Sequence, residues 1–244
     1  MLKNNKEFLN NIIEDITNSN VKLNDILLKV QILAFQLKNE KLKSWVNLEQ
    51  NGYNDLLNKD LPKYRLISTW VNAFIIQSKG FGGYIERNNY PLPLESIDKE
   101  IGDRLSLAPL VNSVSQIEKM IENGNDYRID VPIFLFEEFK NILANNCHIE
   151  RAWQPIPISS LEGVLNSIRS NLLKFLLELN DKIGNDVKIN ISENNINKLF
   201  DKTIGSISIT GKNVYINIDN SETQIKSNES NINLIKGNNN RQDI

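Results

Sequence analysis

The stretch Ser159–Gly184, SSLEGVLNSIRSNLLKFLLELNDKIG, carries the clearest local signal in the chain. Its apolar residues recur every three or four positions, which is the spacing of one helix face. They are Leu161, Leu165, Ile168, Leu172, Phe175, Leu176, Leu179 and Ile183. Ser159 and Glu162 have the spacing of a capping box, and Gly184 is placed to end the helix. The pattern therefore predicts a long core helix. Polar residues interrupt it too often for a membrane span.

Three shorter helices are predicted upstream, over Lys6–Thr17, Leu23–Leu37 and Glu40–Gln50. Each has apolar residues at helical spacing, and Gly52 stands where a glycine commonly follows a helix. The connections between them are short, which favours antiparallel packing in a small bundle.

The pattern changes after Leu61–Pro62, where strand-type residues become frequent. We expect strands over Tyr64–Ser78, Tyr84–Arg87 and Tyr127–Val131, and an extended segment over Cys147–Pro157. The glycines of Gly80–Gly83 suit a turn between the first two strands, and they lack the sequence context of a phosphate-binding loop. Helices are expected over Leu94–Leu105, Leu110–Ile121 and Ile133–Ala144.

After Asp186 the hydrophobic period moves towards two, which is typical of strands. Val187/Ile189/Ile191, Ile207/Ile209 and Val214/Ile216/Ile218 alternate with polar residues, and a short helix around Glu193–Phe200 interrupts them. The prediction is an α+β fold with a helical N-terminal bundle, a central mixed α/β region, a long core helix and a β-rich C-terminal tail. We expect a domain over 1–184, a β-rich appendage over 185–221 and a disordered tail over 222–244.

Composition excludes several classes of protein. The 244 residues are 40% hydrophobic and 24% charged, which is enough apolar material for a core without disulfides or metals. The net charge of −2 makes a general nucleic-acid or anionic-membrane binder a poor fit. A single cysteine excludes a disulfide framework within the chain and a cysteine-rich zinc module. With no apparent leader or membrane segment, we expect a cytoplasmic protein without a cofactor.

Groups suited to catalysis are few. Cys147 and His148 are adjacent in an extended segment, where consecutive side chains point to opposite faces, so they are poorly placed to pair. Asp126, Asp130, Glu138 and Lys140 leave open a metal-dependent nuclease, although the Glu-x-Lys triplet lies on an expected helix. We therefore predict no catalytic and no metal-binding residues, with the nuclease as the alternative.

Cations and aromatic residues interleave between positions 38 and 70, which is a pattern seen in single-strand binding. The cations are Lys38, Lys41, Lys43, Lys59, Lys63 and Arg65, and the aromatics are Trp45, Tyr53, Tyr64 and Trp70. Glu40, Glu49, Asp55 and Asp60 dilute this charge. Nucleic-acid binding by this region is an alternative interpretation. The alternating tail strands could instead pair with those of a second copy.

Residues 23–183 resemble the AbiTii family of abortive-infection, phage-resistance proteins. The matching segments are Leu27–Val30, Leu37–Val46, Glu49–Tyr53, Leu61–Arg65, Tyr90–Leu94, Arg151–Trp153 and Leu161–Leu179. Thr203–Ser206 and Asn213–Tyr215 are similar to the tails that often follow this domain. Each segment is short, and their common order over about two-thirds of the chain carries the resemblance.

The resemblance implies a bacterial antiviral role and supplies no catalytic residues. We expect a phage-defence component that senses, binds or assembles, with self-association, a partner defence protein or a phage component as its partners and no membrane. Tyr64, Arg65, Arg151 and Trp153 are the candidate binding residues. Tyr64 and Arg65 have a structural alternative, because at a helix-to-strand junction they can anchor packing through hydrogen bonds.

Overall fold

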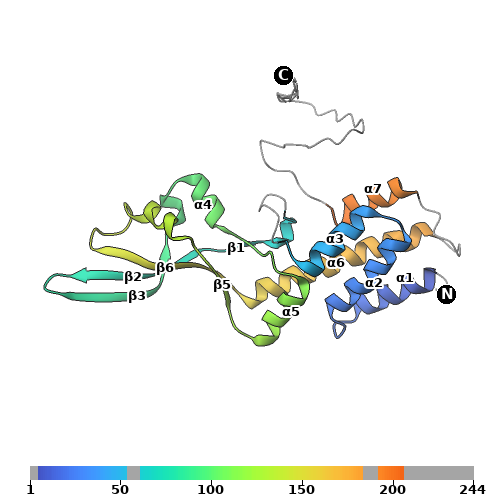
Figure 1. Cartoon of the computed structure of the whole chain (residues 1–244), viewed down its shortest axis with the longest axis horizontal. Helices are drawn as coiled ribbons and strands as arrows, with labels where there is room; N and C mark the ends of the chain where they lie inside the picture. The colour runs from blue at the N-terminus through green and yellow to red at the C-terminus, as the bar shows by residue number, and fades with distance from the viewer. Residues whose placement is uncertain (1–4, 54–60, 184–191, 206–244) are drawn as a thin grey trace, which may run out of the picture. The chain divides into compact units, whose positions relative to one another are not determined.

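A computed structural model describes residues 5–53, 61–183 and 192–205, all of which lie in one compact unit spanning residues 1–208 (Figure 1). The α-helices are α1 (Asn5–Thr17), α2 (Leu23–Gln36), α3 (Glu40–Asn51), α4 (Lys99–Leu105), α5 (Val114–Asn123), α6 (Ile158–Ile183) and α7 (Glu193–Thr203). The strands are β1 (Leu66–Ser68), β2 (Val71–Lys79), β3 (Gly83–Leu92), β4 (Leu107–Pro109), β5 (Tyr127–Asp130) and β6 (Cys147–Ile156). The described residues also form the 3₁₀ helices η2 (Lys63–Arg65), η3 (Leu94–Ser96) and η4 (Ile133–Phe139).

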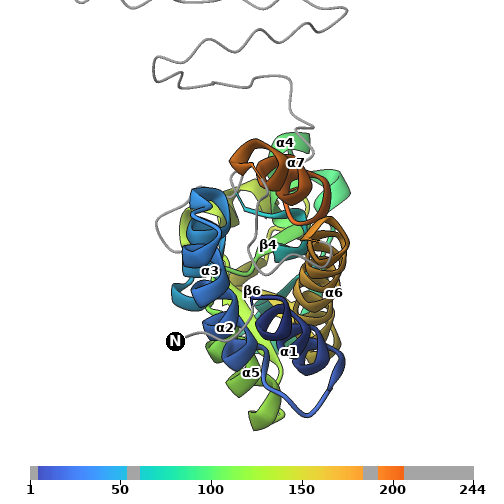
Figure 2. The same cartoon turned by 90° about the vertical axis from the view of Figure 1, so that its right-hand side faces the viewer.

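The long helix α6 organises the helical part of the fold. It packs against α1, α5 and α7, while α2 packs against α1, α3 and α5 (Figure 2). The buried residues of α6 follow the predicted stripe, with Val164 added and Leu165 only partly buried. Arg169 of α6 donates to the carbonyl oxygens of Ile16 at 2.9 Å and Val21 at 2.8 Å. A polar residue within the apolar pattern therefore fixes the turn between α1 and α2.

The four-stranded sheet is antiparallel, with strand order β3-β2-β6-β5. Its registers pair Asn72 with Trp153 and Asp130 with Trp153, so β6 is central. A second core joins one face of this sheet to α4 and η4 through residues such as Ala73, Leu105 and Phe139. β1 and β4 form a separate two-stranded ladder. β6 leads through Pro157 directly into α6, which links the sheet to the helices.

Most predicted elements are present with small shifts at their ends, and the mixed α+β class is confirmed. The predicted capping box at Ser159 is wrong, because α6 begins at Ile158 and the Pro157 carbonyl accepts from Ser160 N at 2.9 Å. Ser159 is thus already inside the first turn. A capping box occurs instead at α5, between Ser113 and Gln116.

Three expected helices also differ. Leu94–Leu105 begins with the 3₁₀ helix η3 and is α-helical only from Lys99 onward, where Asp98 caps α4. Ile133–Ala144 contains only η4, because Phe136 and Phe139, three residues apart, both face the second core, as suits a three-residue turn. Leu110–Ile121 is helical only from Val114 onward, after the strand β4. The strand expected over Tyr64–Ser78 is broken into η2, β1 and β2.

The C-terminal predictions are covered only in part. The short helix expected around Glu193–Phe200 is confirmed as α7, whose Ile196, Leu199 and Phe200 join the same core as α6. The strands expected at 187–191 and 207–218, the tail over 222–244 and Gly184 lie outside the described residues. The division at 184/185 and 221/222 stays a prediction.

Candidate functional site

A buried polar network joins α3 to the segment that follows it. Glu49 of α3 and Arg65 of η2 form an ion pair through Glu49 Oε2 and Arg65 Nη2, and both side chains are fully buried. The hydroxyls of Tyr53 and Tyr64 both donate to Glu49 Oε1, at 2.6 and 2.7 Å. One carboxylate therefore receives three donors, which compensates the cost of burying its charge.

Arg65 extends this network to the chain between β4 and α5. Its Nη1 donates to the carbonyl oxygens of Leu110 at 3.2 Å and Asn112 at 2.5 Å. The guanidinium carbon also lies 4.8 Å from the centre of the Tyr53 ring. Arg65 therefore links three parts of the chain from inside the protein. These contacts are the packing role through hydrogen bonds that the sequence analysis gave as the alternative to ligand binding.

The two tyrosines are held in their neutral form. Burial, followed by the nearby Glu49 carboxylate, raises the pKa of Tyr53 well above its ordinary value of 10.0. The same two causes raise the pKa of Tyr64 in the same direction. Both hydroxyls therefore remain hydrogen-bond donors at neutral pH.

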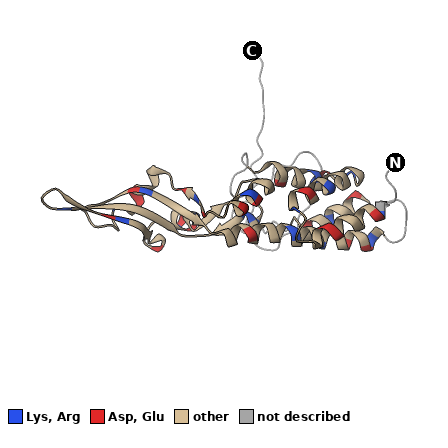
Figure 3. Ribbon diagram, turned by 90° about the horizontal axis from the view of Figure 1, so that it is seen from below, with Lys and Arg blue, Asp and Glu red and all other residues tan. Residues whose placement is uncertain are grey.

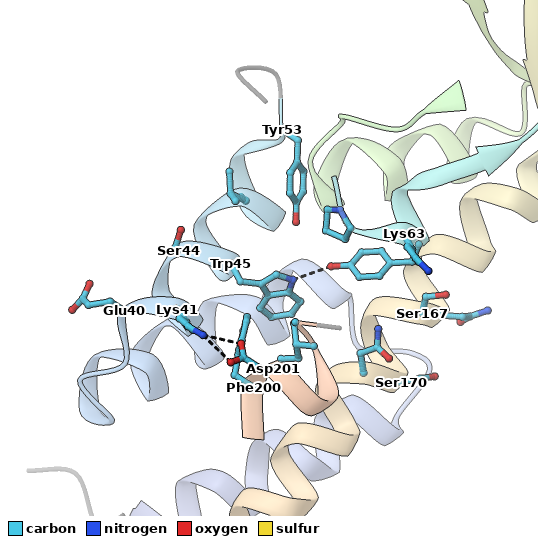
Figure 4. A pocket seen from close by; sticks show the side chains of 17 residues that line it. Glu40, Lys41, Ser44, Trp45, Tyr53, Lys63, Ser167, Ser170, Phe200 and Asp201 are labelled. Atoms are coloured by element: carbon cyan, nitrogen blue, oxygen red, sulfur yellow. Dashed lines mark hydrogen bonds and ion pairs between the residues drawn. The ribbon is translucent and has the colours of Figure 1, made fainter. Parts of the chain in front are cut away.

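A pocket of about 1020 Å³ opens beside the network (Figure 4). Its aromatic wall contains Trp45, Tyr64 and Phe200, with the Trp45 and Phe200 rings edge to face at 6.4 Å. Trp45 Nε1 donates to the Tyr64 hydroxyl at 2.9 Å, which connects this wall to Glu49. The helix α6 adds polar residues to the lining, and Ser167 and Ser170 lie across the pocket from Trp45 (Figure 4). The polar lining residues from α6 are Asn166, Ser167, Ser170 and Asn171.

Charge at the pocket is arranged unevenly. Lys41 and Asp201 form an ion pair of 2.8 Å between α3 and α7 at one side (Figure 4). Lys63, which also lines the pocket and is exposed, makes no ion pair with any described residue. Lys63 is therefore the side chain available to an anionic group on a ligand.

The other two predicted binding residues lie elsewhere. Arg151 and Trp153 alternate along β6 with the buried Ala152 and Gln154, so they point to the sheet face opposite the second core. Trp153 lines a hollow of about 470 Å³ with Trp70 and Arg128. Arg128 lies 5.4 Å from the Trp153 ring centre, and Arg151 lies 5.7 Å from that of Phe74. Tyr64 and Trp153 thus line different hollows.

The interleaved cations do not form one exposed series. Arg65 is buried, Lys41 pairs with Asp201, Lys43 pairs with Glu40, and Lys59 lies outside the described residues. Trp45 and Tyr53 are buried side chains whose open side faces the pocket, so they do not add to an exposed stacking surface along the chain. Figure 3 shows acidic residues interspersed with basic ones along the helices.

The residues of the nuclease alternative are likewise dispersed. Within the described ranges, no three His, Cys, Asp or Glu side chains are grouped closely enough to hold a metal ion. Lys140 pairs with Glu137 on the exposed side of η4. His148 is exposed and contacts Glu150 at 2.7 Å, whereas Cys147 packs against the second core.

The sequence analysis included Glu49 in a segment shared with the family and counted it as a charge that offsets lysines, but it did not predict that Glu49 is buried in an ion pair. Glu49 lies three residues after Val46 and four after Trp45, on the apolar face of α3. An acid at such a position indicates a buried partner. The contribution of α6 amides and hydroxyls to a pocket had no such signal, because those residues fit an ordinary solvated face.

Together, these features define an α+β protein with a preformed pocket over an internal ion-pair network. The AbiTii family model matches residues 7–203. The chain belongs to the AbiTii family, which is a family of abortive-infection proteins. Neither a curated protein nor a solved structure matches the chain. None of the described helices is both long and apolar enough to cross a membrane.

Proposed function

We propose that this chain acts in phage defence by binding a ligand in the pocket between α3, α6 and α7, in the cytoplasm, rather than by catalysis of its own. The observation that carries the proposal is the pocket itself. It is large, it is lined by both aromatic and hydrogen-bonding side chains, and it abuts a buried hydrogen-bonded network. Concave sites of mixed lining next to perturbed ionisable groups are the usual form of ligand sites.

The lining indicates the chemistry of the ligand. Trp45, Tyr64 and Phe200 suit a flat apolar group, and the α6 side chains offer donors and acceptors to its polar edge. Lys63 favours a ligand that also carries a negative charge. We infer a small organic anion with an aromatic or similarly flat part.

Tyr64 connects the pocket to the buried network, so a ligand bound there can affect contacts elsewhere in the fold. It touches the pocket on one side and Glu49 on the other, and Glu49 pairs with Arg65, which holds the chain at Asn112. A ligand that displaces Tyr64 therefore loosens the contact between α3 and the start of α5. We expect a partner to recognise the altered conformation, and the candidates are a second copy, another defence protein and a phage component.

Filling the pocket provides the test. Ser170 is exposed and lines the pocket, whereas Ser159 is exposed on the same helix and does not. Ser170→Trp should abolish protection in a phage plating assay and should reduce binding of the dye anilinonaphthalene sulfonate, a flat aromatic anion. Ser159→Trp, the matched control, should leave both unchanged. Full protection by Ser170→Trp would contradict the proposal.

The nuclease alternative is tested separately. Glu138 and Lys140 are both exposed on or beside η4, so their replacement should not affect folding. We expect Glu138→Ala/Lys140→Ala to protect as well as the unmodified chain. Loss of protection with an unchanged melting temperature would favour a nuclease over ligand binding.

A further inference from the structure

The helix α2 is apolar on two sides. One side supplies buried residues to the main core, including Leu27, Val30 and Leu33. The other side carries Leu28, Ile32 and Phe35, whose exposed fractions are 50%, 47% and 63%. Their spacing of four and three residues aligns them along one line of the helix, which we call the outer stripe of α2.

The contacts of α2 leave this outer stripe open. α2 packs on α1, α3 and α5 with its other side, and it lies across the bundle from α6 (Figure 2). Lys43 reaches over the Phe35 ring at 4.7 Å and shields it only in part. Large aliphatic and aromatic side chains aligned on one exposed helix face are typical of an interaction surface.

We propose that the outer stripe of α2 binds the same stripe of a second copy of this chain, with the two helices antiparallel about a two-fold axis. The stripe is symmetric about the point between Gln31 and Ile32. Leu28 and Phe35 are equally far from this point, so the axis places Leu28 of each copy against Phe35 of the other. The two Ile32 side chains then meet at the centre. Such self-complementarity is what an isologous dimer requires.

Charge selects the antiparallel orientation. Asp25 and Lys38 are exposed, and they are equally far along the sequence from the same central point, with Lys38 two residues beyond the end of α2. Neither forms an ion pair with a described residue, and the antiparallel arrangement brings Asp25 of each copy level with Lys38 of the other. A parallel pair would place like charges together, which opposes association. The helix dipoles also favour the antiparallel pair, because each positive end then lies beside a negative end.

The size of the surface sets the strength of the dimer. α2 has 14 residues, so it is about 21 Å long. One helix pair of this length buries less than the roughly 1,200 Å² of a stable complex, so the dimer should dissociate on dilution. This inference does not rest on the pocket ligand, and either proposal can fail without the other.

Sedimentation velocity of the full chain over a range of concentrations tests the dimer. We expect the mass to rise towards twice 28.0 kDa as concentration increases. Ile32→Asp should weaken association at least tenfold. Leu177→Asp is the matched control, because Leu177 is 49% exposed on α6 and the charge change is the same. A monomer at roughly 100 μM, or equal effects of the two variants, would overturn the proposal.

A charge exchange tests the orientation. Asp25→Lys and Lys38→Asp alone should each weaken the dimer several-fold, since each creates two repulsive contacts per dimer. The double variant Asp25→Lys/Lys38→Asp should restore it. Lys38 has a φ of 52°, which aspartate tolerates better than most residues, so this variant should fold. Failure of the double variant to recover association, with unchanged melting temperatures, would overturn the antiparallel pairing.

Discussion

Replacing Glu49 by Gln should be among the most damaging single changes in the described part of the chain. The variant keeps the shape of the side chain but loses its charge, and its amide nitrogen cannot accept a hydrogen bond. Glu49 now accepts from Arg65 on one oxygen and from Tyr53 and Tyr64 on the other. Glutamine has one acceptor oxygen, so it can accept either from Arg65 or from the two tyrosines. It is also neutral, so in either orientation Arg65 remains a buried charge without a negative partner.

The structure allows the size of the effect to be estimated. Both members of the pair have 0% exposure, so solvent cannot replace the lost carboxylate. Removing one partner of such a pair costs about 3–5 kcal/mol, a large part of a typical total of roughly 5–15 kcal/mol. The matched control is Asp201→Asn, which breaks the half-exposed pair with Lys41 and should cost less than about 1 kcal/mol.

Urea unfolding of the full chain, followed by circular dichroism, measures both values. The double variant Glu49→Gln/Arg65→Met should lose less stability than the sum of its single changes, because the second substitution removes the uncompensated charge. A cost below about 1 kcal/mol for Glu49→Gln would refute the view that this network holds the fold together. Simple additivity of the two changes would refute the coupling.

Three further predictions concern neighbouring features. Burial raises the pKa of Tyr53 and Tyr64 in the folded chain, so above about pH 10 the unfolded chain loses these protons while the folded chain keeps them. The free energy of unfolding should therefore fall as the pH rises, by up to ~1.4 kcal/mol per pH unit for each tyrosine. Tyr53→Phe should make this decline shallower in urea titrations, and an equal slope would contradict the assignment. Gly52→Ala should destabilise by about 1–3 kcal/mol in thermal unfolding, because φ is +92° and the new Cβ would lie 2.8 Å from the Val111 carbonyl oxygen; an unchanged midpoint would disprove this steric conflict. Ser113→Ala should cost ~1 kcal/mol through its lost cap, whereas Ser159→Ala should change stability by less than about 0.5 kcal/mol; equal costs would reverse the placement of the capping box.

Some features could be predicted from sequence because their cause is local. The helices α1, α2, α3 and α6 follow from apolar residues at helical spacing. The hairpin of β2 and β3 follows from strand-forming residues on either side of Gly80–Gly83. Family membership could also be predicted, because it depends on short segments in a fixed order.

Other features depended on three-dimensional contacts that the pattern of residue types does not specify. Ser159 and Glu162 have the spacing of a capping box, but the helix already begins with the hydrogen bond from Ser160 N to the Pro157 carbonyl oxygen. The segment at Ile133–Phe139 has enough apolar residues for an α-helix, yet its packing on the second core selects a 3₁₀ helix. Spacing along the chain cannot decide either outcome.

The sequence by itself determined the helical framework and the α+β class, since hydrogen bonds between near neighbours and the period of apolar residues set them. Only the tertiary structure decided that Glu49 and Arg65 are buried together and that α3, α6 and α7 enclose a pocket. The physical reason is that the stability of a buried charge depends on the partner that reaches it. Here that partner lies 16 residues away along the chain, and the α6 residues that line the pocket lie more than a hundred residues further on.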